Sequence, residues 1–121
     1  MIKARVLVVE DEEIILADVQ RQLRKQGYTI AGTASSGEEA IRAAASTSPD
    51  IIVMDIRLQG RINGLEAARR IRESSAVPIL FVSAHAGALA ANLPNLPGHN
   101  SILLKPFSPT ELREAIQAML G

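Results

Sequence analysis

Five short aliphatic runs recur along the chain at similar intervals. They are residues 5–9, 28–33, 50–55, 77–83 and 101–105. In the first run, Val6 to Val9 are apolar without alternation. A strand with one solvent-exposed face would alternate apolar with polar residues, so this pattern is typical of a strand buried on both faces. We therefore predict five strands.

Between these runs, apolar residues recur at helical spacing. Ile15, Val19 and Leu23 fall four residues apart, on one face of a helix, and Gly27 supplies its stop. Similar spacing follows in three later segments. The four predicted helices are residues 12–26, 36–47, 63–75 and 108–120.

Two of these helices carry start signals. Ser36 or Ser35 can cap the second helix. The last begins with Ser108 as N-cap, Pro109 at the first helical position and Glu111 placed to close a capping box. Local hydrogen bonding should fix where both helices begin.

The alternation of strands with helices predicts an α/β fold, a doubly wound parallel sheet with helices on both faces. We expect one domain over residues 1–121. Residues 87–101 break the rhythm, because Pro94, Pro97 and Gly98 stand where a fourth helix belongs. Any helix there should end before Pro94, which predicts a shortened or irregular fourth helix.

Composition narrows the class of protein. The chain is 47% hydrophobic with three aromatic residues, and its 13 basic and 13 acidic residues cancel. No overall field would draw it to nucleic acid or to an anionic membrane. The chain lacks cysteine, a secretory signal pattern and any stretch that could span a bilayer. We expect a cytoplasmic domain without direct contact to nucleic acid or membrane.

Charged and hydroxyl residues follow the predicted strands. Four consecutive acids, Glu10 to Glu13, come directly after the first strand. Asp55, Ser83 and Lys105 stand at the ends of the third, fourth and fifth. Ligands of an open parallel sheet bind beyond the carboxyl ends of its strands, so these side chains should converge at one edge.

Each of these residues also has a structural explanation. The acids could only stabilise a helix N-terminus, and Asp55, Ser83 and Lys105 could be a turn residue, a helix cap and a surface charge. These explanations would all have to hold together at the same edge of the sheet. Crowded acids repel one another unless a cation relieves them, and Mg²⁺ binds through one or two carboxylates plus phosphate. The pattern therefore favours a magnesium site between Asp11, with Glu10 behind it, and Asp55.

A hydroxyl and a lysine suit a phosphoryl group on one of these acids. A carboxylate that attacks phosphorus makes an acyl phosphate, whose oxygens need donors and cations. Ser83 and Lys105 would supply them, and Asp55, at the end of the central strand, is the best-placed nucleophile.

The motifs "VLVVEDE", "DIIVMDI", "LFVSA" and "LLKPF", in this order, resemble the response regulator receiver domain of two-component signalling. The resemblance covers nearly the whole chain. It implies a flavodoxin-like (βα)5 fold with strand order 2-1-3-4-5. It implies that Asp55 is phosphorylated by a histidine kinase or phosphotransfer protein. It also implies that Mg²⁺ is bound by Asp11 directly, by Glu10 through water, by Asp55 and by the backbone carbonyl of Arg57.

By the same resemblance, Ser83 is the switch hydroxyl, Lys105 contacts the phosphoryl group, and the bond before Pro106 is cis. The loop after Asp55 departs from the family pattern. It reads "DIRLQGRINGLEAA", which makes Asp55 to Gly64 one residue longer than the common spacing and basic in charge.

A second departure concerns the switch. Ile102 stands where many receivers carry an aromatic residue, so aromatic rotamer switching is not expected. We hypothesise that phosphorylation instead orders or shifts residues 85–100.

The histidines and a cluster of arginines outside the predicted site have simpler structural interpretations. His85 and His99 are expected in loops. Arg69, Arg70 and Arg72 are expected to spread around the solvated side of their helix rather than form a patch for nucleic acid.

Three function classes remain open. The first is a phosphoacceptor signalling module, which is no enzyme beyond self-catalysed phosphoryl acceptance and slow autodephosphorylation. The second is a phosphohydrolase, disfavoured because Arg57 stands where such enzymes carry a second acid. The third is a degenerate receiver that binds partners without phosphate. We favour the first, as a stand-alone or excised receiver, monomeric or weakly dimeric, with a downstream protein target.

Overall fold

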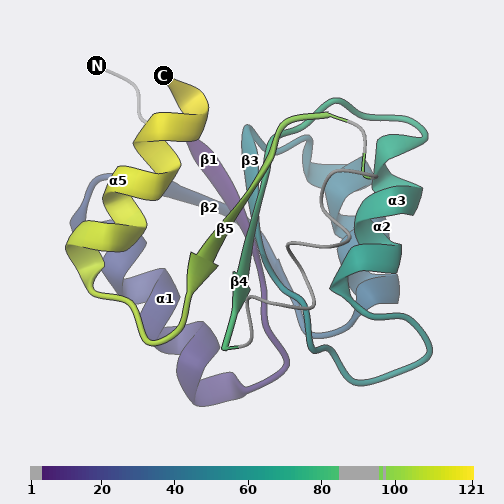
Figure 1. The fold of residues 1–121 in the computed structure, drawn as a ribbon, viewed down its shortest axis with the longest axis horizontal. Coiled ribbons are helices and arrows are strands. Elements are labelled where there is room, and N and C mark those ends of the chain that lie inside the picture. The colour runs from purple at the N-terminus through teal and green to yellow at the C-terminus, as the bar shows by residue number, and fades with distance from the viewer. Residues whose placement is uncertain (1–3, 85–95, 97) are drawn as a thin grey trace.

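The computed structural model describes residues 4–84, 96 and 98–121. Five parallel strands form one sheet in the order β2-β1-β3-β4-β5, so the predicted topology is confirmed. Figure 1 shows the sheet through the middle of the molecule. The strands are β1 (Arg5–Val9), β2 (Thr29–Ala34), β3 (Ile51–Asp55), β4 (Ile79–Ser83) and β5 (Asn100–Leu104).

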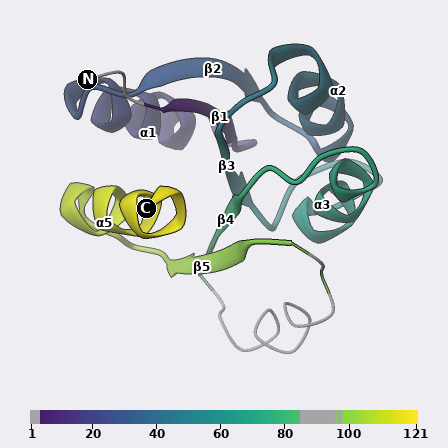
Figure 2. The same ribbon diagram turned by 90° about the horizontal axis from the view of Figure 1, so that it is seen from above.

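Helices cover both faces of the sheet. Seen from above in Figure 2, α1 and α5 lie on one side of the strands, and α2 and α3 lie on the other. The helices are α1 (Glu13–Lys25), α2 (Gly37–Thr47), α3 (Gly64–Arg72) and α5 (Pro109–Leu120). Within the described residues, no helix is both long and apolar enough to cross a membrane. The predicted irregular fourth helix and the switch segment fall mainly on residues outside those described, and both stay predictions.

The sheet divides the core into two layers. Leu7 and Val9 pack with the α2 and α3 side, whereas Val6 and Val8 pack with the α1 and α5 side. Successive side chains of a strand point to opposite faces, so a strand covered on both faces has to be apolar throughout. This explains the unbroken run in β1, and β3 and β4 are buried along their whole length in the same way.

The predicted helix starts are confirmed. The Ser36 side chain accepts a hydrogen bond from the backbone N–H of Glu39 at the start of α2. Ser108 and Glu111 form a complete capping box at the start of α5. Caps of this kind contribute about 1 kcal/mol each. Gly27 follows the end of α1 with a φ of 92°, a conformation that favours glycine.

The third helix ends earlier than predicted. It stops at Arg72, whose guanidinium turns toward the start of β5. The guanidinium donates to the carbonyl of Val77, to the carbonyl of His99 over 3.0 Å and to Asn100 Oδ1 over 2.8 Å. The prediction that Arg72 lies on the solvated side was therefore wrong, because this residue ties α3 to the edge strand.

The two neighbouring arginines behave as predicted. Arg69 and Arg70 are exposed and pair with Glu66 at 3.8 and 3.5 Å. Exposed pairs of this kind contribute little to stability. His99 lies exposed in a bend before β5, as expected for a turn residue.

Candidate metal centre

Residues from four different segments meet at the carboxyl edge of the sheet. Strand pairing places Asp55 opposite Val82, and Ser83 opposite Leu104. Ser83 therefore ends β4 beside the end of β3, and Lys105 follows directly on β5. In Figure 1 the arrows of β4 and β5 point to this edge, away from the C-terminus. Parallel strands thus bring together side chains that lie far apart in sequence.

The run of four acids divides at this edge. Glu10 is 4% exposed and Asp11 is half-buried, whereas Glu12 and Glu13 are exposed. The backbone N–H of Glu12 donates to Glu10 Oε2 over 3.2 Å. Glu13 lies in the first turn of α1, where the helix dipole favours an acid. The helix-start explanation fits the last two acids, and the first two belong to the site.

Three carboxylates are close enough to share one cation. Oxygen atoms of Glu10, Asp11 and Asp55 all lie within 4.8 Å of one another. Magnesium prefers carboxylate oxygens and binds through few protein ligands. An all-oxygen donor set of two buried acids and one half-buried acid fits such an ion, and the residues present therefore agree with the predicted magnesium site.

Lys105 holds two of the three acids. Its ammonium Nζ lies 2.9 Å from Glu10 Oε1 and 2.8 Å from Asp55 Oδ2. The backbone N–H of Lys105 donates to the carbonyl of Ser83 over 2.8 Å, which fixes where the side chain starts. The bond between Lys105 and Pro106 is cis, as predicted. The lysine supplies a positive charge that reduces repulsion between the acids.

Burial and charge shift two pKa values at the site. Burial, with the charge of Asp55 nearby, raises the pKa of Glu10 to about 7, although the hydrogen bond from Lys105 opposes this rise. Burial lowers the pKa of Lys105, but hydrogen bonds to Asp55 and Glu10 outweigh it and hold the pKa above its usual value. Lys105 therefore keeps its charge at neutral pH, and Glu10 titrates near neutrality.

The loop between β3 and α3 contributes backbone donors. The N–H of Arg57 donates to Asp55 Oδ1 over 3.1 Å, and the N–H of Gln59 donates to Asp11 Oδ2 over 3.1 Å. The backbone of Arg57 thus lies beside Asp55, and the role of its carbonyl as a metal ligand stays a prediction. Sequence reasoning missed Gln59, because a backbone amide leaves no residue-type signal; the unusual loop length was the available indication.

Ser83 completes the set of predicted residues. It is 6% exposed at the end of β4, one residue beyond the strand partner of Asp55. A buried hydroxyl residue at this place agrees with the predicted contact to a group on Asp55. All six predicted site residues are thus gathered at one edge of the sheet.

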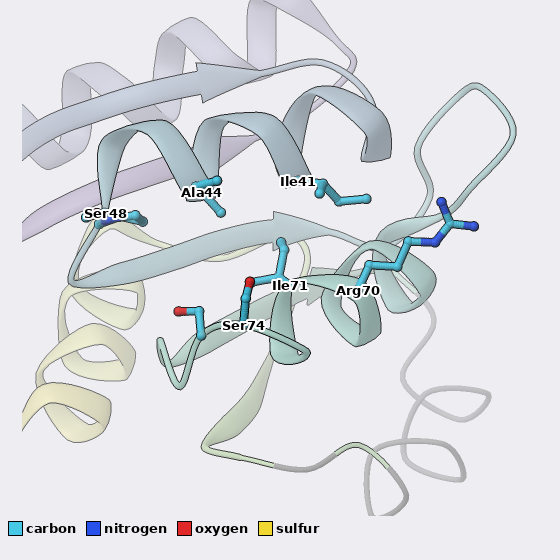
Figure 3. A pocket seen from close by; sticks show the side chains of 9 residues that line it. Ile41, Ala44, Ser48, Arg70, Ile71 and Ser74 are labelled. Carbon is cyan, nitrogen blue, oxygen red and sulfur yellow. The ribbon is translucent and has the colours of Figure 1, made fainter.

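A separate groove lies between α2 and α3. It has a volume of about 380 Å³ and is lined by residues that include Ile41, Ala44 and Ile71. Figure 3 shows Ser48 at one end of this groove and Arg70 at the other. None of the clustered acids lines it. The groove is therefore not part of the candidate metal centre.

Comparisons with known proteins agree with this site. The sequence model of the response regulator receiver domain matches residues 6–117. The chain is 35% identical over 113 residues to the transcriptional regulatory protein PdtaR of Mycobacterium tuberculosis, covering 93% of this chain and 55% of that protein. It is 36% identical over 117 residues to the alkaline phosphatase synthesis transcriptional regulatory protein PhoP of Bacillus subtilis, covering 96% of this chain and 48% of PhoP. The chain spans about half the length of the curated relatives it matches.

A solved structure is similar over nearly the whole of both chains. It is the receiver domain of sensor histidine kinase PA1611 from Pseudomonas aeruginosa PAO1. The TM-score is 0.87 at 32% sequence identity, with 98% of each chain covered. In that neighbour a magnesium ion is coordinated in the active-site cleft.

Proposed function

This chain belongs to the response regulator receiver domain family of two-component signalling, and on that premise we propose that it accepts a phosphoryl group on Asp55 with the help of Mg²⁺. The observation that carries the proposal is the surrounding of Asp55. One of its carboxylate oxygens lies 2.8 Å from the ammonium of Lys105, and both other clustered acids lie within reach of a shared cation.

The proposed reaction is a direct transfer between two nucleophiles. A carboxylate oxygen of Asp55 attacks phosphorus while the bond from phosphorus to the donor's histidine nitrogen breaks, and that nitrogen keeps the bonding electrons. Mg²⁺ bound by Asp11, Glu10, Asp55 and the Arg57 carbonyl would neutralise charge on the phosphoryl oxygens.

This chain's own residues supply the remaining contacts. The ammonium of Lys105 would leave Asp55 Oδ2 for a phosphoryl oxygen, which needs a small movement because Lys105 already reaches the carboxylate. Ser83, on the neighbouring strand, would donate its hydroxyl to a second oxygen. If the Ser83 hydroxyl moves to bind the phosphoryl group, the end of β4 can move with it.

We infer that the chain is a signalling module rather than an enzyme acting on external substrates. Self-catalysed phosphoryl acceptance and slow autodephosphorylation would be its whole chemistry. Arg57, two residues after the proposed nucleophile, is exposed and basic, so it gives no acid to protonate a leaving group. The second candidate function is that of a degenerate receiver, which binds partners without phosphate. The altered loop after Asp55 is the observation that favours it.

The proposed partners are a histidine kinase or phosphotransfer protein and a downstream protein target. Membership of the receiver domain family supports these partner classes. We propose a cytoplasmic monomer or weak dimer that acts on neither nucleic acid nor membrane directly.

Transfer from a phosphorylated histidine kinase tests this proposal. A radiolabelled phosphoryl group on the kinase histidine should move to the parent chain in the presence of Mg²⁺. Asp55→Asn should receive none, and Asp50→Asn, an exposed acid at the opposite edge of β3, should behave like the parent. Equal labelling of Asp55→Asn and the parent would overturn the assignment of Asp55.

A further inference from the structure

The loop between β3 and α3 reaches across the site to the acid run after β1. The backbone N–H of Gln59 donates to Asp11 Oδ2 over 3.1 Å, joining residues 48 positions apart. The amide of the loop, rather than the Gln59 side chain, makes this contact. Every residue except proline could provide it.

The course of the loop is set by packing against α2. Ile62 is 9% exposed and lies directly over Gly37, where an added Cβ would come within 2.5 Å of Ile62 Cγ1 and 2.9 Å of its carbonyl oxygen. Only a glycine at position 37 leaves room for this approach. The loop is thus held by a fitted contact shortly after Gln59.

Two further features shape the same loop. Gly60 has a φ of 109°, a conformation that favours glycine, and a Cβ added there would lie 3.2 Å from Glu38 Oε2. The Asn63 side chain accepts from the backbone N–H of Glu66 over 2.9 Å and so caps α3. Ile62 and Asn63 thus hold the loop after Gln59, and the Arg57 N–H, which donates to Asp55 Oδ1 over 3.1 Å, holds it before. The N–H of Gln59 is therefore directed at Asp11 by the fold.

We propose that the backbone N–H of Gln59 is a positioning group for the metal centre, an inference that rests on the proposed magnesium site. A carboxylate has two oxygens, so Oδ2 of Asp11 can accept from Gln59 while the other oxygen remains for the cation. Hydrogen bonds to metal-binding carboxylates orient them, and their loss weakens metal binding. The extended loop would thereby hold Asp11 ready for Mg²⁺.

The opposite possibility is that the Gln59 amide competes with the metal for Asp11. In that case removing the amide proton would strengthen Mg²⁺ binding. The two possibilities predict opposite signs for the same measurement, which makes the inference testable by binding alone.

The test compares Gln59→Pro, which removes the N–H, with Gln59→Ala, which keeps it and changes only the side chain. Mg²⁺ affinity is measured by titration calorimetry on both variants and the parent, after thermal unfolding has established that each is folded. We expect Gln59→Pro to bind Mg²⁺ about tenfold more weakly and Gln59→Ala to match the parent. Equal or tighter binding by Gln59→Pro would overturn the inference.

A second measurement needs no change at Gln59. Amide hydrogen exchange of Gln59, followed by NMR, should be slow in the parent with and without Mg²⁺ and clearly faster in Asp11→Ala. Exchange that is indifferent to Asp11→Ala would contradict the inference. If the parent itself bound no Mg²⁺, the proposed function would fail. If the parent bound Mg²⁺ and Gln59→Pro bound it with the same affinity, only the positioning role of Gln59 would be overturned.

Discussion

Burial separates the four consecutive acids after β1 into two pairs. Glu12 and Glu13 are solvated and lie at the start of α1, where an acid is stabilised by the helix dipole. Glu10 is buried against Lys105, and Asp11 reaches the loop after β3. A buried acid in contact with a lysine and a second acid is costly for stability, a cost that the proposed metal site would account for.

The raised pKa of Glu10 predicts a pH dependence of stability. In the folded, metal-free chain this pKa is about 7, above its value of about 4.5 in the unfolded chain. The folded state therefore binds the proton more tightly than the unfolded state. This protonation contributes its full stabilisation below pH 4.5, and the contribution is lost as the pH rises through 7. We expect Glu10→Gln to be more stable than the parent at pH 8 and equal to it near pH 4.

Thermal unfolding of the parent and Glu10→Gln across this pH range, without divalent metal, measures the effect. Glu12→Gln serves as the control, because its side chain is exposed. If the difference in stability between the parent and Glu10→Gln did not change with pH, the raised pKa of Glu10 would be contradicted.

At the scale of elements, local patterns predicted most of the strands and helices. The predicted first strand, residues 5–9, is β1 as observed, and the caps at Ser36 and Ser108 were identified correctly. Periodicity and capping depend on neighbours in sequence, so they can be read from the chain itself. The most visible error was at the end of α3. Arg72 belongs to a contact with β5 that is 28 residues away along the chain.

The turn from β3 into α3 depends on a glycine that carries no chemistry. An added Cβ at Gly64 would lie 2.4 Å from the carbonyl oxygen of Asp55 and 2.9 Å from Ile56 Cα. Both atoms belong to the backbone and cannot yield as a side chain does. The spacing from Asp55 to Gly64 was visible in the sequence, but this close approach was not, because it depends on how the loop folds back.

Gly64→Ala should therefore destabilise the protein by about 2 kcal/mol, by overpacking, and weaken Mg²⁺ binding by displacing Asp55. In an unconstrained helix the same change would be stabilising. The matched control is Gly32→Ala in β2, whose added Cβ would meet side-chain atoms of Thr47 and Leu7 at 3.3 and 3.7 Å. Urea unfolding and Mg²⁺ titration of both variants test this, and a stabilised Gly64→Ala would show that the turn is not as tight as described.

At the scale of the whole molecule, the parallel sheet explains why the site could be predicted at all. Five parallel strands end at one edge, and polar residues at or just after the ends of β1, β3, β4 and β5 reach the same small volume. The sequence therefore indicated Asp11, Asp55, Ser83 and Lys105 without any knowledge of distances. It could not indicate that Lys105 bridges Glu10 and Asp55, since this depends on side-chain positions from β1, β3 and β5 together.

The central claim is that the acids after β1 form a magnesium site serving Asp55. Its most direct test is the intact mass of the chain after incubation with a small-molecule phosphodonor, with and without Mg²⁺, beside Asp55→Asn. We expect one phosphoryl adduct on the parent that requires Mg²⁺ and is absent from Asp55→Asn. No adduct under any condition, together with no Mg²⁺ binding, would contradict this claim and favour a receiver that binds its partner without phosphate.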